Sequence, residues 1–219
     1  MPKVSVIINT FNRPYMLKQA VASVLAQTLD DWQIVVAVDH TEKDVSMSWE
    51  LRRNILDAFE IEDERILYDY TDLTPGDQSL NRFAHNINRA FRLCTGEYIS
   101  YLCDDDLFLP WRLSVFSRVL DENSDFQVVY GKQMVWDIPT QRFTEERPAR
   151  VHIPQTADGS GPVGRVNHNS IMHRRECFEA VGGWVENAPA RLGDAYFFAR
   201  LNQRWPFIPV DCVGEIMRM

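Results

Sequence analysis

Three consecutive aspartates, Asp104 to Asp106, follow the apolar stretch "EYISYLC". Adjacent ionised carboxylates repel one another and are costly to bury. Either they turn into water and cap the helix expected near Pro110, or a cation brings them together. Mg²⁺ and Mn²⁺ take oxygen ligands, and the i, i+2 spacing would let Asp104 and Asp106 face one ion while Asp105 turns elsewhere. The position at the end of a buried strand favours the metal interpretation.

Other polar side chains occupy comparable positions. Asp39 ends a second apolar run, "WQIVVAVD", where it could accept hydrogen bonds from a nucleotide base or ribose. Arg13 and Arg82 could pair with phosphate, although either one taken singly is an ordinary surface arginine. Asp194 stands at the start of an expected helix, as a general base or as the helix N-cap, and the local sequence leaves both open.

Two histidines invite a metal interpretation, which the spacing does not favour. His168 and His173 are five residues apart on an expected strand, so their side chains would point to opposite faces. We expect ordinary hydrogen-bonded histidines here.

Strands and helices alternate through the first half of the chain. Apolar, β-branched runs predict strands over residues 4–9, 32–39, 65–70 and 97–102, and helical periodicity predicts helices over 15–27, 45–59 and 79–93. This alternation is typical of parallel strands joined by helical crossovers. Ligands of such sheets bind beyond the carboxyl ends of the strands. The loop "TFNR", Asp39 and the aspartate cluster should therefore meet at one edge.

The second half has a different pattern. We expect helices over 111–120, 175–181 and 193–203, antiparallel strands over 126–136 and 142–146, and a further strand over 169–174. The stretch from Arg147 to Arg165 is rich in Pro and Gly, and so long a loop is typical of a lid or a disordered segment.

The composition restricts the class of protein. The chain has 219 residues, 45% of them hydrophobic and 25% charged, with a net charge of −8, which is ordinary for a globular domain and argues against a nucleic-acid partner. Its four cysteines are scattered, as expected of reduced thiols. No run approaches the roughly 18 apolar residues of a membrane span, and the first residues do not match a signal peptide. We expect a cytoplasmic protein.

The motifs taken together resemble a known family. "VSVIINTFNRP", "VASVLAQT", "VAVD" and "TGEYISYLCDDD" occur in the order found in family 2 glycosyltransferases, and the run from "HNSIMHRRECFEAVGGW" to "RLGDAYFFARLNQRWPFIPVD" is similar to the spore coat polysaccharide glycosyltransferase within that family. The resemblance implies an α/β GT-A fold, a single domain with a mostly parallel nucleotide-binding sheet and a smaller mixed acceptor-side region. Residues 1–106 would bind the nucleotide sugar, and residues 107–219 the acceptor, with a lid at 147–165.

The resemblance also implies residue roles. The loop that holds the nucleotide base matches Asn9, Thr10, Phe11 and Arg13. Asp39 matches the acid that recognises the uracil or thymine ring. Asp104 and Asp105 match the aspartates that face the ribose and the metal-bound diphosphate, and Asp106 completes a D-x-D motif. The implied ligands of Mn²⁺ or Mg²⁺ are therefore Asp104, Asp105 and Asp106. Asp194 matches the catalytic base. The family's arginine upstream of the third helix has no clear counterpart, and Arg82 is a candidate substitute.

The implied reaction is inverting transfer from a UDP- or dTDP-sugar to a hydroxyl acceptor that the sequence does not identify. Three alternatives stay open. A non-catalytic sugar-nucleotide binder would keep the same donor site. A phosphatase with D-x-D usually carries that motif on its first strand, whereas here the motif comes late. Such a phosphatase also has a second acidic motif, G-D-x-x-x-D, and here Phe198 occupies the position of its last aspartate. A nucleotidyltransferase would need a Gly- and Lys/Arg-rich phosphate loop, which "NTFNRP" is not.

Overall fold

The computed structural model describes residues 1–39, 63–71, 81–147, 166–189 and 192–219. The helix expected over 45–59 and the lid expected over 147–165, apart from Arg147, lie outside the described residues. All four cysteines are free. No helix among the described residues is both long and apolar enough to cross a bilayer.

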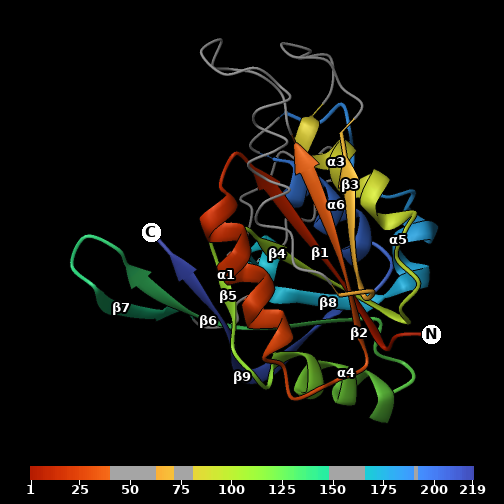
Figure 1. Cartoon of the computed structure of the whole chain (residues 1–219). Helices are drawn as coiled ribbons and strands as arrows, with labels where there is room; N and C mark the ends of the chain where they lie inside the picture. The colour runs from red at the N-terminus through yellow and green to blue at the C-terminus, as the bar shows by residue number, and fades with distance from the viewer. Residues whose placement is uncertain (40–62, 72–80, 148–165, 190–191) are drawn as a thin grey trace.

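The described residues form one twisted sheet of nine strands, in the order β3-β2-β1-β4-β8-β6-β9-β5, with β7 paired to β6 (Figure 1). The first part of this sheet is parallel: β1 pairs with β2 and β4, and β2 pairs with β3. These strands are β1 (Val4–Phe11), β2 (Trp32–Asp39), β3 (Ile66–Tyr70) and β4 (Tyr98–Cys103). The alternation of strands and helices had predicted this arrangement, which is confirmed.

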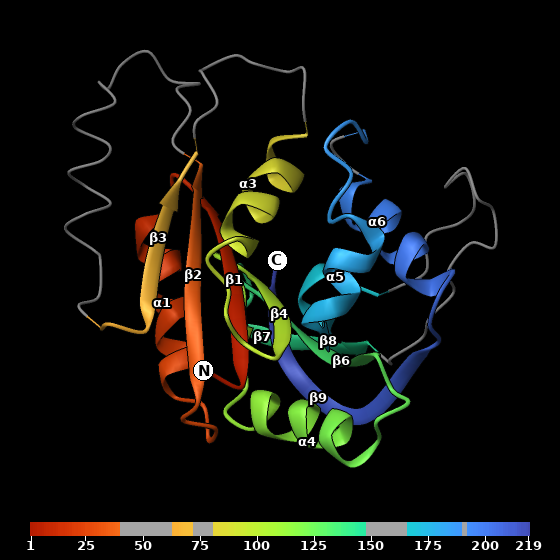
Figure 2. The same cartoon turned by 90° about the vertical axis from the view of Figure 1, so that its right-hand side faces the viewer.

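Strands β1, β2 and β4 are apolar on both faces because helices cover both faces. Helices α1 (Pro14–Leu25) and α4 (Arg112–Glu122) pack into the core on one side. Helices α3 (Arg82–Phe91), α5 (Arg175–Val181) and α6 (Gly193–Asn202) pack into the core on the other side. Figure 2 shows α4 below the sheet and α3, α5 and α6 on its opposite face.

The remaining strands form the mixed part of the sheet: β5 (Leu107–Phe108), β6 (Val128–Asp137), β7 (Arg142–Arg147), β8 (Ile171–Arg174) and β9 (Phe207–Arg218). β6 is antiparallel to β7 and β8 and parallel to β9. The β6–β7 hairpin, which the sequence predicted, projects from the body of the molecule (Figure 1). The long strand β9 was not expected. It lies between β6, to which it is parallel, and β5, to which it is antiparallel.

The register brings the carboxyl ends of the parallel strands together, as predicted. In the strand register, Phe11 at the end of β1 pairs with Asp39 at the end of β2, and Asn9 pairs with Cys103 at the end of β4. The backbone N–H of Asp104 donates to the Asn9 carbonyl at 3.2 Å. The aspartate turn therefore continues directly from the middle of the sheet, beside the loop that follows β1.

Candidate functional site

Asp104 points at the loop after β1. Its Oδ2 accepts hydrogen bonds from Thr10 Oγ1 at 2.7 Å and from the backbone N–H of Phe11 at 3.3 Å. Its Oδ1 accepts from Arg13 Nη1 at 3.0 Å, and the same nitrogen lies 2.6 Å from Asp105 Oδ2. Asp104 and Thr10 are buried, whereas the Arg13 side chain is half-exposed. The carboxylate thus fixes the predicted nucleotide loop, and Arg13 supplies a cation at its rim.

Asp106 is held from the other side. Its Oδ1 accepts a hydrogen bond from the backbone N–H of Arg218, at 2.8 Å, and its Oδ2 accepts from Asn169 Nδ2. The Asn169 Oδ1 in turn accepts from the Cys103 N–H at 2.8 Å. The Arg218 guanidinium donates to the backbone carbonyls of Asp105 and Asp104. Two elements far apart in the sequence, the 3-10 turn at His168–Ser170 and the end of β9, therefore clamp the aspartate turn.

This geometry differs from the expected i, i+2 arrangement. Asp104 is engaged with the loop after β1, and the ligand atoms that come within 4.8 Å of one another are those of Cys103, Asp105 and Asp106. The capping alternative also does not hold, because Trp111 occupies the N-cap of α4, where no side-chain cap bond forms. The short strand β5 separates the turn from the helix, which is why the aspartates do not cap it.

The carboxylates fit a hard divalent cation. Burial and, to a lesser extent, the nearby Asp105 charge raise the pKa of Asp106 to about 6, although the hydrogen bond from the Arg218 N–H opposes the shift. Burial raises the pKa of the Cys103 thiol well above its usual value, as do the aspartates, so it stays protonated and is no ligand for Mg²⁺ or Mn²⁺. Asp105 and Asp106 remain as two carboxylates, the number Mg²⁺ commonly uses, and each oxygen keeps a lone pair beside its present bond.

A buried charged network lies behind the aspartate turn. Arg112 and Glu215 are both fully buried, with Nε and Oε2 3.7 Å apart. Arg112 Nη2 donates to the carbonyls of Asn169 and Ile171, and Gln133 Nε2 donates to Glu215. Burial, only partly opposed by the Arg112 charge, raises the pKa of Glu215 to about 7. The network fixes the backbone at Asn169, whose side chain holds Asp106.

Asp39 and Arg82 form an ion pair at the same edge of the sheet. Arg82 Nε and Nη2 lie 3.0 and 3.1 Å from the two Asp39 oxygens. Arg82 opens α3, whose N-cap is Asn81. The structure thus joins two residues that the sequence assigned separately to base and phosphate recognition. Asn9, which was also predicted to contact the nucleotide, has a buried Oδ1 without a hydrogen-bond partner among the described residues.

Asp194 is the second residue of α6 and not its N-cap, which is Leu192. It is half-buried, its Oδ1 accepts from the Ala195 N–H at 2.8 Å, and burial raises its pKa. A Cβ built on the preceding Gly193 would lie 3.0 Å from Asn81 Nδ2. Because Asn81 precedes Arg82, Asp194 lies on the side of the molecule that carries the Asp39–Arg82 pair. No hydrogen bond between described residues links it to the aspartate turn.

The expectation of ordinary hydrogen-bonded histidines is right for one of the two. His173 Nε2 lies 2.8 Å from the Tyr101 hydroxyl. The expectation is wrong for His168, which lies in the 3-10 turn and not on a strand. Both of its ring nitrogens are buried without a partner among the described residues, and it packs against the rings of Phe83, Tyr101 and Trp184. Burial accordingly lowers its pKa to about 3, so it is a neutral side chain.

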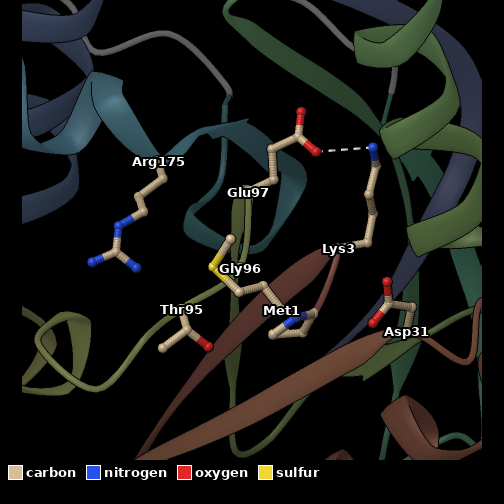
Figure 3. Close-up of a pocket in the computed structure, with 8 residues that line it drawn as sticks. Met1, Lys3, Asp31, Thr95, Gly96, Glu97 and Arg175 are labelled. Atoms are coloured by element: carbon tan, nitrogen blue, oxygen red, sulfur yellow. Dashed lines mark hydrogen bonds and ion pairs between the residues drawn. The ribbon is translucent and has the colours of Figure 1, made fainter.

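A cavity of about 800 Å³ lies at the opposite edge of the sheet. Figure 3 shows its lining, which includes Lys3, Glu97 and Arg175 at the amino ends of β1, β4 and α5. Lys3 Nζ and Glu97 Oε2 are 3.0 Å apart. Ligands of parallel sheets bind at the carboxyl ends of the strands, so this cavity is not the counterpart of the aspartate site despite its size.

Comparison with known proteins relates the chain to one protein family. Residues 5–179 match the family model for glycosyl transferase family 2. The chain is 32% identical over 220 residues to Protein CgeD of Bacillus subtilis. This alignment covers 95% of this chain and 48% of the relative. It is 27% identical over 135 residues to GalNAc(5)-diNAcBac-PP-undecaprenol beta-1,3-glucosyltransferase of Campylobacter jejuni, covering 62% and 39%. The chain thus spans less than half the length of both relatives.

Among solved structures, the crystal structure of S. aureus TarS 1-349 in complex with UDP-GlcNAc is similar, with a TM-score of 0.67 at 16% identity, covering 99% of this chain and 58% of that one. At that identity the likeness concerns the fold. The expected GT-A fold is confirmed, and the closer likeness to the spore coat polysaccharide glycosyltransferase remains a prediction.

Proposed function

The chain belongs to glycosyl transferase family 2, and on that premise we propose that it transfers a sugar from a nucleotide-diphosphate sugar to a hydroxyl group of an acceptor. The observation that carries the proposal is the convergence of the Asp39–Arg82 pair and the aspartate turn at one edge of the sheet. β2 and β4, which deliver them, flank β1. A nucleoside would lie across β1, with its diphosphate over the end of β4.

The donor contacts follow from this placement. Asp39, held by Arg82, would accept a hydrogen bond from the base. The Asn9 Oδ1, which has no partner in the described part of the chain, would accept one from a second donor group on the nucleotide. Arg13 would face the diphosphate as a half-exposed cation. The TarS structure contains UDP-GlcNAc, and by analogy we favour UDP, with dTDP as the next donor class.

Asp105 and Asp106, with Asp104 beside them, would hold Mn²⁺ or Mg²⁺. Such an ion, when bound, supplies positive charge for the diphosphate leaving group. Asp194 would take the proton of the acceptor hydroxyl, and its raised pKa makes it a stronger base than an exposed aspartate. Attack from the face opposite the diphosphate would invert the anomeric configuration, through a transition state like that of glycoside hydrolysis.

Calorimetric titration with UDP, dTDP, GDP and ADP, each with and without Mn²⁺, tests the donor site. We expect one pyrimidine diphosphate to bind, more tightly with Mn²⁺. Equal affinity with and without Mn²⁺ would rule out the metal assignment. Failure of all four to bind would leave the fold without the proposed donor site.

The base assignment is tested by Asp194→Asn. We expect sugar transfer, or hydrolysis of a UDP-sugar to UDP and free sugar, to fall at least about a hundredfold while UDP affinity stays unchanged. Glu176→Gln is a matched control, because Glu176 is also an acid in a helix first turn, that of α5. Unchanged turnover in Asp194→Asn would refute the assignment. UDP binding without any turnover in the wild-type chain would favour the non-catalytic binder.

A further inference from the structure

A second cavity, of about 440 Å³, lies beside the β6–β7 hairpin, and we propose that it binds the acceptor as a saccharide subsite. Its lining consists of Gln133, Glu145, Arg147, Val166 and Asn167. The volume falls in the range of about 300–1,000 Å³ typical of small-molecule sites. The inference rests on the proposed glycosyl transfer, and it names the residues that recognise the acceptor.

The lining suits a neutral polyhydroxylated ligand. It offers two amides, one carboxylate and one guanidinium, planar groups with several hydrogen-bonding atoms each. Gln133 Nε2 already donates to Glu215, and its amide oxygen remains for a ligand hydroxyl. The charges of Glu145 and Arg147 cancel, with Nε and Oε1 2.6 Å apart. The buried side chain of Val166 adds an apolar wall. A strongly charged ligand would find no net complement here.

The cavity is adjacent to the aspartate turn. Asn167 Oδ1 accepts from the Asn169 N–H at 3.3 Å, and Asn169 donates to Asp106. Asn167 Nδ2 and Arg147 Nη1 both contact the sulfur of Met217, the residue before Arg218. The cavity lining is therefore in direct contact with Asn169, one of the two residues that clamp the aspartates. A saccharide that starts in this cavity can extend toward the aspartate turn, where its hydroxyl must come within about 3–3.5 Å of the donor sugar.

The strand order favours the acceptor over the donor as the occupant. The nucleotide residues lie on β2, β1 and α3, and the cavity lies on β6 and β7, which are on the other side of β4 and β8. A donor placed with its base at Asp39 and its diphosphate at the end of β4 has its leaving group between the base and this cavity. The acceptor hydroxyl must approach from the side away from the leaving group, which is the side of β6 and β7.

The test is binding of simple glycosides by saturation-transfer NMR titration, with UDP present. The probes are the methyl β-glycosides of glucose, galactose and N-acetylglucosamine. We expect wild type to bind at least one of them, and Glu145→Ala and Asn167→Ala each to weaken that binding about three- to tenfold, the loss of one hydrogen bond. Glu146→Ala is the matched control, because Glu146 is the next residue of β7, equally exposed and on the opposite face.

The UDP affinity of each sample, measured alongside, separates this inference from the proposed function. If wild type binds UDP but none of the glycosides, the inference is overturned and the donor site stands. The inference is also overturned if Glu145→Ala and Asn167→Ala keep wild-type affinity, or if Glu146→Ala weakens binding as much as they do. If wild type binds none of UDP, dTDP, GDP and ADP, the proposed function itself fails.

Discussion

Replacing Asn169 by Ala should destabilise the protein more than any exposed asparagine substitution would. The side chain is fully buried and joins two neighbours: Oδ1 accepts from the Cys103 N–H at 2.8 Å, and Nδ2 donates to Asp106. Alanine keeps the Asn169 carbonyl, which still accepts from Arg112. The change therefore removes the link between the end of β4 and the aspartate turn and leaves the charged network behind it in place.

The expected cost follows from the groups left without partners. A buried donor or acceptor that loses its only partner costs about 1–3 kcal/mol, and more if it is charged. The Cys103 N–H loses the side-chain acceptor described for it, whereas Asp106 keeps the bond from the Arg218 N–H. We therefore expect a loss of about 2–5 kcal/mol in the free energy of unfolding. The hydrogen bond from Asn169 lowers the pKa of Asp106, so its removal should raise that pKa further.

The measurement is urea unfolding at neutral pH, followed by fluorescence. Asn123→Ala is the control, because Asn123 is a partly buried asparagine whose side chain makes one hydrogen bond, to Val119 O at 2.9 Å, and we expect a loss of about 1 kcal/mol there. If Asn169→Ala unfolds within about 0.5 kcal/mol of wild type, then Asn169 does not hold the aspartate turn as described.

Three further predictions concern other contacts. Arg82→Ala should weaken UDP binding at least about tenfold, whereas Arg89→Ala, which removes a similar ion pair on the same helix, should leave UDP affinity unchanged in calorimetry; equal effects would contradict the nucleotide role of Arg82. Because the pKa of Glu215 is about 7 in the folded chain and near 4.5 unfolded, the native state binds more protons between these values, so stability should fall by up to about 3 kcal/mol as pH rises from 4.5 to 7. Glu215→Gln should flatten this dependence in urea unfolding, and an unchanged slope would contradict it. Gly131→Ala would place a Cβ 2.3 Å from Phe116 Cζ and should cost about 1–3 kcal/mol, measured by thermal unfolding; an unchanged melting temperature would contradict the packing.

The parallel half of the fold was predictable because its signals are local and consistent. β1, β2 and β4 are buried on both faces and read as continuous apolar runs. Pro14 starts α1 as its first residue. Once the strands are parallel, the position of each polar residue at a strand end follows from topology alone. The convergence of the "TFNR" loop, Asp39 and the aspartates needed no side-chain information.

Strand β9 could not be predicted in the same way. Its sequence, "FIPVDCVGEIMR", contains Pro209 and Gly214 and has no regular alternation of buried and exposed residues, and a proline in a run argues against a central strand. The register shifts in its pairing with β6 explain the lost alternation. Arg218 and Asn169, the two residues that clamp the aspartate turn, were missed because their role depends on this pairing and on the 3-10 turn.

The grouping of the aspartates also depends on tertiary contacts. From spacing alone, Asp104 and Asp106 were the natural pair. In the structure Asp104 accepts hydrogen bonds from Thr10 and Arg13 instead. The end of β1 and the loop after it place a hydroxyl, a backbone N–H and a guanidinium beside the Asp104 carboxylate. Sequence spacing records which residues can share an ion, but not which of them a neighbouring strand has already engaged.

The clamp by Arg218 has a consequence for the order in which the molecule forms during synthesis. The N–H that holds Asp106 lies 112 residues further along the chain, so a ribosome must release nearly the whole of this sequence before the aspartate turn can close. The parallel strands β1, β2 and β4 can pair earlier, because their contacts are complete by residue 103. Closing so long a loop is slow compared with local pairing. We expect nascent chains halted before β9 to contain a parallel sheet with an open aspartate turn, so that the candidate site forms after the parallel sheet that supports it.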